Sequence, residues 1–81
     1  MNTYYVIERR KDHKFVSGSD FRYSPPRSII ADEYRPPLLI AEHELDFQLH
    51  RRKINLEKYK VTRVCICEIR EYPKARENEQ L

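Results

Sequence analysis

Glycine is scarce in this chain, because only one of its 81 residues, Gly18, is a glycine. A loop that cradles phosphate with its backbone needs several glycines at fixed spacing, so that kind of site is excluded. No nucleophile can be paired with a base either, since His13 lies in a predicted turn and the other histidines on a predicted helix. We therefore expect a binding module, not an enzyme, and no cofactor.

Cysteine is almost as scarce, with Cys65 and Cys67 on one predicted strand. Side chains two residues apart on a strand lie about 6.5–7 Å apart, which strains a local disulfide, so we expect reduced thiols. No second Cys or His pair stands at metal-ligand spacing, which favours buried strand thiols. His43 and His50, with Asp46 between them, are too far apart in sequence to share one ion, so we expect a solvated helix face and no metal.

Long apolar runs are also missing. No run approaches the roughly 20 residues that span a bilayer, and residues 1–5 lack the pattern of a signal peptide, so we expect a cytoplasmic protein without a membrane partner. What the chain does contain is 40% hydrophobic and 36% charged residues, with a net charge of +3. This composition predicts one small domain over residues 1–72 and a disordered charged tail over residues 73–81.

Residues 41–53 form the clearest regular element. Ala41, Leu45 and Leu49 follow the spacing of one helical stripe, which predicts a helix docked on the core along that side. Phe47 falls almost opposite, and Ile40 and Ile54 join it if helical geometry extends in both directions. The helix thus carries a second apolar stripe that needs its own explanation.

The remaining pattern is mainly that of strands. Residues 3–9 and 14–17 predict a hairpin with Phe15 facing the core, and a turn at 17–20 gives Gly18 a positive φ. Further expectations are a short strand at 21–23, a helical turn at 28–34 and Asn55 as the helix C-cap. A long strand is expected over 59–72, either central in the sheet or partly covered on both faces. The fold class is α+β, with a mainly antiparallel sheet of three to four strands and one main helix on one face, in the order ββαβ.

A set of core and turn positions carries a resemblance to a known family. These positions are the segments Tyr4–Ile7, Lys14–Gly18, Arg51–Ile54 and Tyr59–Val61, together with Glu44, Leu45, Leu49 and Val64. With them the chain resembles the small ββαβ proteins encoded in phages and prophages of Gram-positive bacteria, over roughly residues 3–69. The resemblance implies an accessory phage protein that acts on a host component by binding it, a class that includes inhibitors of host defence.

Two surfaces are candidates for a partner. The first is Phe47 with Ile40 and Ile54, rimmed by Arg51, which fits a host protein or a second copy of the chain. The alternative is that residues 24–37 fold over the helix and bury Phe47. The second surface consists of two basic clusters that could lie at one end of the molecule and bind the phosphates of a nucleic acid. The competing explanation for these basic residues is that they are solvated and complement the helix dipole. These clusters are Arg9, Arg10, Lys11 and Lys14, and Arg51, Arg52 and Lys53.

Overall fold

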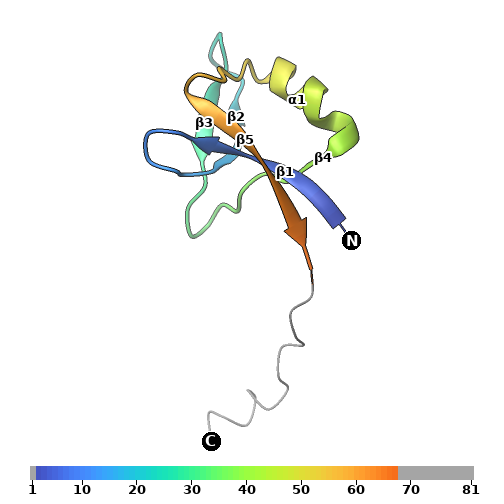
Figure 1. Cartoon of the computed structure of the whole chain (residues 1–81). Helices are drawn as coiled ribbons and strands as arrows, with labels where there is room; N and C mark the ends of the chain where they lie inside the picture. Colours follow the sequence, from blue (N-terminus) through green and yellow to red (C-terminus); the bar gives the residue numbers. More distant parts are fainter. Residues whose placement is uncertain (1, 68–81) are drawn as a thin grey trace, which may run out of the picture.

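The computed structural model describes residues 2–67 and has an α+β fold, which confirms the predicted class (Figure 1). The helical segment has ten residues, a 3₁₀ turn followed by the α-helix. The predicted tail, and the end of the predicted last strand with Ile69, lie outside the described residues. The elements are β1 (Asn2–Arg9), β2 (Val16–Asp20), β3 (Arg27–Ile30), β4 (Ile40–Ala41), the 3₁₀ turn η1 (Glu42–Glu44), α1 (Leu45–Arg51) and β5 (Tyr59–Ile66).

The main sheet has three antiparallel strands in the order β4-β1-β5. Its β1–β5 ladder runs without a break from the pair Asn2↔Ile66 to the pair Arg9↔Tyr59. Both strands are rich in β-branched and aromatic residues, which suit a pleated, half-buried surface. Among residues 2–67, β5 has β1 as its only neighbour, so of the two alternatives predicted for β5 the central strand was wrong. The other alternative, a strand partly covered on both faces, agrees with Val64 lining a hollow and Tyr59 packing on the core. The central strand is β1.

The predicted single sheet is divided, because β2 pairs with β3 in a separate two-stranded sheet. An isolated bridge between Glu8 and Phe15 is the pairing that joins β1 to the start of the second sheet. Gly18 sits at an irregularity in the β2–β3 register, inside a strand, and its φ is not positive. The expected turn at 17–20 was therefore wrong. Within the described part of the chain, the residues with left-handed backbone are His13, with φ 61°, and Lys53, with φ 55°.

Residues 21–34 differ most from the sequence-based prediction. The expected strand at 21–23 is a turn, and most of the expected helical turn is β3 and the loop after it. Two β-branched residues, Ile29 and Ile30, outweigh the weak helical signal because their side chains pack well on a sheet. The loop then turns at Asp32, whose carboxylate accepts hydrogen bonds from the backbone N–H groups of Tyr34 and Arg35.

The hydrophobic core lies between α1 and the two sheets. Its centre is Ile7, Val16 and Ile40, and the helical residues Leu45 and Leu49 pack against it, as their stripe predicted. Ala41 belongs to β4 and not to the helix. Phe15 was expected in this core but is 36% exposed, because it lines a hollow on the other face of the main sheet.

That other face is covered by the chain between β3 and β4. Val6 and Val64 line the hollow from the sheet, and Pro36, Pro37 and Leu39 line it from the covering segment. In Figure 1 this green segment passes on the opposite side of β1 from α1. The prolines therefore do not fold over the helix, and the alternative that residues 24–37 bury Phe47 was wrong. Within residues 2–67, no helix is long and apolar enough to cross a membrane.

Candidate binding surfaces

The outer side of α1 carries an exposed aromatic ring. Phe47 is 62% exposed, although it stands between Leu45 and Leu49, which both pack on the core. Successive turns of a helix place Phe47 and Arg51 on one face, since they are four residues apart. We call the surface formed by Phe47, Arg51 and the neighbouring Phe21 the outer helix face.

Two residues predicted for this surface do not belong to it. Ile40 is only 3% exposed, because residue 40 lies in β4 and its side chain enters the core. Ile54 also packs against the core. The prediction assumed that the helix extends beyond residues 42–51 in both directions, and this assumption was wrong. Of the four residues predicted for the partner site, only Phe47 and Arg51 remain on this surface.

The C-terminal end of α1 explains the position of Ile54. The backbone N–H of Ile54 donates to Leu49 at 3.1 Å, and that of Lys53 donates to His50 at 3.1 Å. Together with the positive φ of Lys53, these two bonds form a Schellman motif. Such a motif usually includes a hydrophobic contact between the two positions that Leu49 and Ile54 occupy here. Arg52 is therefore the C-cap, and the prediction that Asn55 caps the helix was wrong.

Phe21 joins the outer helix face through cation–π contacts. The guanidinium of Arg51 lies 4.6 Å from the centroid of the Phe21 ring, and that of Arg52 lies 5.7 Å from it. Arg52 also donates to the Ser19 hydroxyl at 2.8 Å and to the Gln48 side chain at 3.0 Å. Burial, followed by the charge of Arg51, lowers the pKa of Arg52. These contacts fix Arg52 in place and leave Arg51 as the more exposed cation of the pair.

The loop after β2 holds a second arginine–aromatic contact. Arg27 lies over the Tyr23 ring at 3.9 Å from its centroid. At the base of this loop, Arg22 donates hydrogen bonds from Nε and Nη2 of its guanidinium to the Asp20 carboxylate, at 3.0 and 2.8 Å, and this hydrogen bonding lowers the pKa of Asp20 to about 2. Sequence reasoning missed the role of Phe21 and Tyr23, because nothing local in the sequence pairs a loop aromatic with the end of a distant helix.

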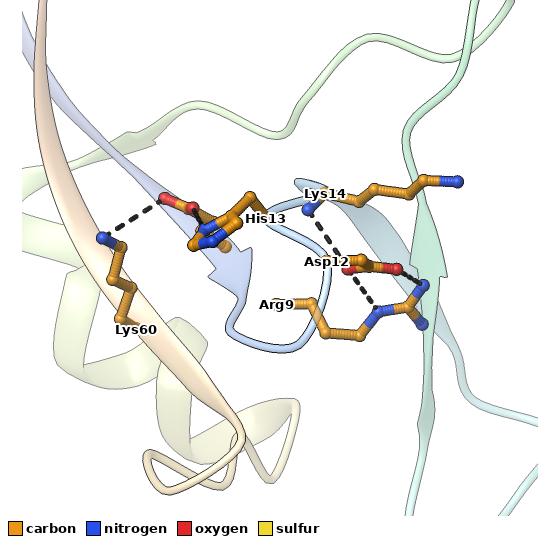
Figure 2. Close-up of polar contacts among 6 residues, drawn as sticks. Arg9, Asp12, His13, Lys14 and Lys60 are labelled. Atoms are coloured by element: carbon orange, nitrogen blue, oxygen red, sulfur yellow. Dashed lines mark hydrogen bonds and ion pairs between the residues drawn. The ribbon is translucent and has the colours of Figure 1, made fainter.

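The first basic cluster surrounds the turn after β1 (Figure 2). Arg9 donates to the Asp12 carboxylate at 3.1 and 2.6 Å, and this interaction lowers the pKa of Asp12 to about 2. Lys14 donates to Asp12 with its backbone N–H, while its ammonium group points away from Asp12 (Figure 2). One of the predicted cations, Arg9, is therefore largely neutralised.

Glu8 links this turn to β5. Its carboxylate lies 2.7 Å from Nδ1 of His13 and 3.7 Å from the ammonium of Lys60. The hydrogen bond to His13 is the main cause that lowers the pKa of Glu8, and the charge of Lys60 adds to it. The left-handed backbone of His13 therefore holds its ring over a buried carboxylate.

Beside this turn lies a cleft of about 520 Å³, which we call the turn cleft. It opens between the turn after β1 and the loop that precedes β5. The two loops are joined by the backbone N–H of Arg10, which donates to the Lys58 carbonyl at 2.9 Å, and by Nε of Arg10, which donates to the Leu56 carbonyl at 3.2 Å. The lining residues are Arg9, Arg10, Lys11, Glu57, Lys58 and Tyr59.

The two predicted basic clusters thus have different neighbours. The cluster at 9–14 faces the loop before β5, whereas Arg51 and Arg52 of the other cluster face Phe21 and Ser19. Within residues 2–67, no hydrogen bond or ion pair joins one cluster to the other. Whether they act as one nucleic-acid-binding patch stays a prediction. The contribution of Lys58 was not foreseen, because it depends on the β1–β5 register.

The cysteines and histidines were the other candidates for chemistry. Both thiols are free, but Cys65 and Cys67 are exposed, so the prediction that they are buried was wrong. The reason is that they lie at the end of an edge strand, beyond the part of β1 that the core covers. In the part of the chain that the structure describes, no group of three or more His, Cys, Asp or Glu residues is placed to hold a metal ion.

Comparison with known proteins adds no assignment to these surfaces. No protein-family model, curated protein or solved structure matches this chain.

Proposed function

We propose that this protein is a non-enzymatic binding module that engages another protein through the outer helix face. The observation that carries the proposal is the exposure of Phe47 on a helix whose other side is docked. Covering an aromatic ring of this kind removes apolar surface from water, which contributes about 25 cal/mol for each Å². Phe47 is therefore the anchor of the proposed interface.

The neighbours of Phe47 support this assignment. Arg51 is held over the Phe21 ring, so part of its conformational freedom is already lost before a partner binds. Aromatic residues and arginine are the types that most often dominate the binding energy of protein interfaces. A matching partner has an apolar pocket for Phe47 and a carboxylate at its rim for Arg51.

Two partners fit this chemistry. The resemblance to small phage proteins favours a host protein, which the module would inhibit or redirect. A second copy of the chain is the other candidate, in which two Phe47 rings would cover each other in a homodimer. The oligomeric state of the purified protein separates these two forms of the proposal.

The test compares three alanine variants. Phe47→Ala should weaken assembly, or capture of the host partner, while the melting temperature stays close to that of the native protein. Leu45→Ala should lower the melting temperature, because Leu45 packs on the core. Tyr34→Ala removes an aromatic ring that is 84% exposed in a distant loop, and should change neither property. Light scattering, thermal melts and pull-down with each variant give the comparison.

Two results would overturn the proposal. If Phe47→Ala lowers the melting temperature as much as Leu45→Ala does, Phe47 stabilises the fold and is not an interface residue. If Tyr34→Ala reduces association as much as Phe47→Ala, the association is a general effect of exposed aromatic rings.

Nucleic-acid binding is the second candidate function, and the observation in its favour is the set of cations around the turn cleft. Side chains of Arg and Lys contact phosphates without reading the sequence, so the expected binding is salt-sensitive and sequence-tolerant. Titration against duplex DNA and RNA at two salt concentrations tests this function. Binding that persists at high salt and prefers one sequence would contradict it.

A further inference from the structure

The turn cleft holds more positive charge than its surroundings neutralise. Four of its six lining residues are cations, and Glu57 is the one carboxylate among them. Arg9 is paired with Asp12 outside the lining. Among the described residues, Arg10, Lys11 and Lys58 take part in no ion pair. Three positive charges therefore meet in the cleft against one negative charge.

The cleft is held in shape by the backbone before any ligand binds. The turn on one side is closed by the N–H of Arg9, which donates to Lys14 at 2.7 Å, and by that of His13, which donates to Arg9 at 2.7 Å. The loop on the other side is closed by Asn55, whose carbonyl accepts from Lys58 and Tyr59 at 3.0 Å each. Because these bonds fix the loops, little backbone ordering remains to oppose binding.

Arg10 is the side chain best placed to hold a ligand. Its Nε donates to the Leu56 carbonyl at 3.2 Å, which fixes the plane of the guanidinium. The described residues provide no hydrogen-bond partner for its two terminal nitrogens. A guanidinium fixed in this way presents a planar pair of donors, the geometry that suits a phosphate or a carboxylate.

Charge and size together decide between these two anions. A carboxylate carries a single negative charge, whereas a phosphate monoester carries about 1.5 to 2 negative charges near neutral pH, closer to the excess in the cleft. The volume of about 520 Å³ is larger than a phosphate group needs and falls in the usual range of small-molecule sites. Tyr59, which packs in part against the core, also lines the cleft and is an aromatic residue of the kind that stacks on flat groups.

We infer that the turn cleft binds the phosphate group of a nucleotide-sized ligand, with Arg10, Lys11 and Lys58 as the phosphate-binding residues. The phosphate is a monoester, carried either by a free nucleotide or by the 5′ end of a strand. The inference concerns residues apart from Phe47, Arg51 and Phe21, so it is independent of the protein-binding function proposed above. It rests on the same turn cleft as the second candidate function, nucleic-acid binding.

The test measures binding of adenosine monophosphate to the whole chain by calorimetry, with adenosine as the ligand that lacks phosphate. We expect the nucleotide to bind and adenosine not to bind. The double variant Lys11→Gln/Lys58→Gln should lose affinity by about tenfold or more, since each lost contact is charge-assisted. Lys14→Gln is the matched control, because Lys14 belongs to the same turn but does not line the cleft. It should lose about twofold at most, from the change in net charge alone.

Two further ligands identify the source of the phosphate. A short 5′-phosphorylated oligothymidylate that binds more tightly than the nucleotide, and loses affinity in the double variant, supports the inference with a strand as the source. A glutamate peptide that binds as well as the nucleotide overturns it, because the site is then a general anion surface. Equal binding of adenosine and its monophosphate, no binding by either phosphate ligand, or equal losses in Lys14→Gln and the double variant would each overturn it as well.

Discussion

The two sheets are held in different ways, although both are antiparallel. The β1–β5 ladder pairs eight residues with eight in one unbroken register. The β2–β3 sheet pairs fewer residues, and its register shifts between Val16 and Gly18. A two-stranded sheet is marginally stable by itself, so β2–β3 depends on what it touches. Val16 and Ile30 supply that support through the shared core.

This difference shows where the stability of the domain arises. The ladder contributes Ile7 to the centre of the core, and β2 contributes Val16, which is fully buried. Backbone pairing then attaches the smaller sheet, since the N–H of Leu38, in the segment that leads to β4, donates to the Val16 carbonyl at 2.9 Å, and an isolated bridge joins Glu8 of β1 to Phe15. The smaller sheet is therefore a dependent layer, and the ladder is the part that organises it.

The largest expected effect comes from Ile7→Ala, which opens a cavity at the centre of the ladder. Ile7 is 1% exposed, so the free energy of unfolding should fall by about 2–5 kcal/mol. Ile66→Ala is the control at the exposed end of the same ladder, and it should cost about 1 kcal/mol or less. Urea unfolding curves measure both. Similar losses in the two variants would mean that the ladder, and not the core, sets the stability.

A smaller effect of opposite sign is expected from Gly18→Ala in the other sheet. The φ of Gly18 is not positive, and a Cβ added there would meet nothing within 4 Å. Alanine restricts the unfolded chain more than glycine does, so the free energy of unfolding should rise by about 0.4–1 kcal/mol. A thermal melt detects the change. A lower melting temperature would show that the irregular register around Gly18 needs the freedom of glycine.

The smallest expected effect is a loss of stability at acidic pH, which compares the ion pair in the turn after β1 with the ion pair at the end of β2. Arg9 and Arg22 hold the pKa values of Asp12 and Asp20 at about 2, below the usual 3.8. A carboxyl with a lowered pKa contributes stability that is present above pH 4 and is lost as the pH falls toward 2. The melting temperature should therefore decline over that range.

Replacing each aspartate by asparagine shows which of the two ion pairs causes this decline. Asp12→Asn should flatten the decline more than Asp20→Asn, because Arg9 is mostly covered whereas Arg22 is mostly exposed to screening solvent. Thermal melts at several pH values between 4 and 2 measure both slopes. Equal slopes in both variants and the native protein would indicate that other carboxyl groups govern the acid sensitivity.

Sequence reasoning succeeded where one local pattern decided the structure. The helical stripe of Leu45 and Leu49, the strand character of β1 and β5, and the α+β class follow from periodicity and β propensity. It failed where distant contacts decide, as in residues 21–34, where β3 forms only because β2 lies beside it. A short apolar pair such as Ile29–Ile30 is compatible with either a helical turn or a strand.

The candidate sites show the same division. Phe47 and Arg51 were assigned correctly to one outer helix face, because four-residue spacing is local. Ile40 was assigned wrongly, since only its pairing with Tyr5 shows that it lies in a strand. One side of the turn cleft was predicted from the sequence, as part of the basic cluster at residues 9–11. Its other half, Lys58 and Tyr59, comes from the register of a ladder that joins distant segments.

The position of β1 at the centre of its sheet has a consequence for how the chain folds. Its partner β5 comes from residues 59–66, near the other end of the described chain. Pairings between segments so far apart raise the contact order, which slows folding because a large loop must close first. During synthesis, β1 leaves the ribosome long before β5 exists. We therefore expect the domain to fold only after β5 has been synthesised. Until then, the apolar residues of β1 stay exposed and accessible to chaperones.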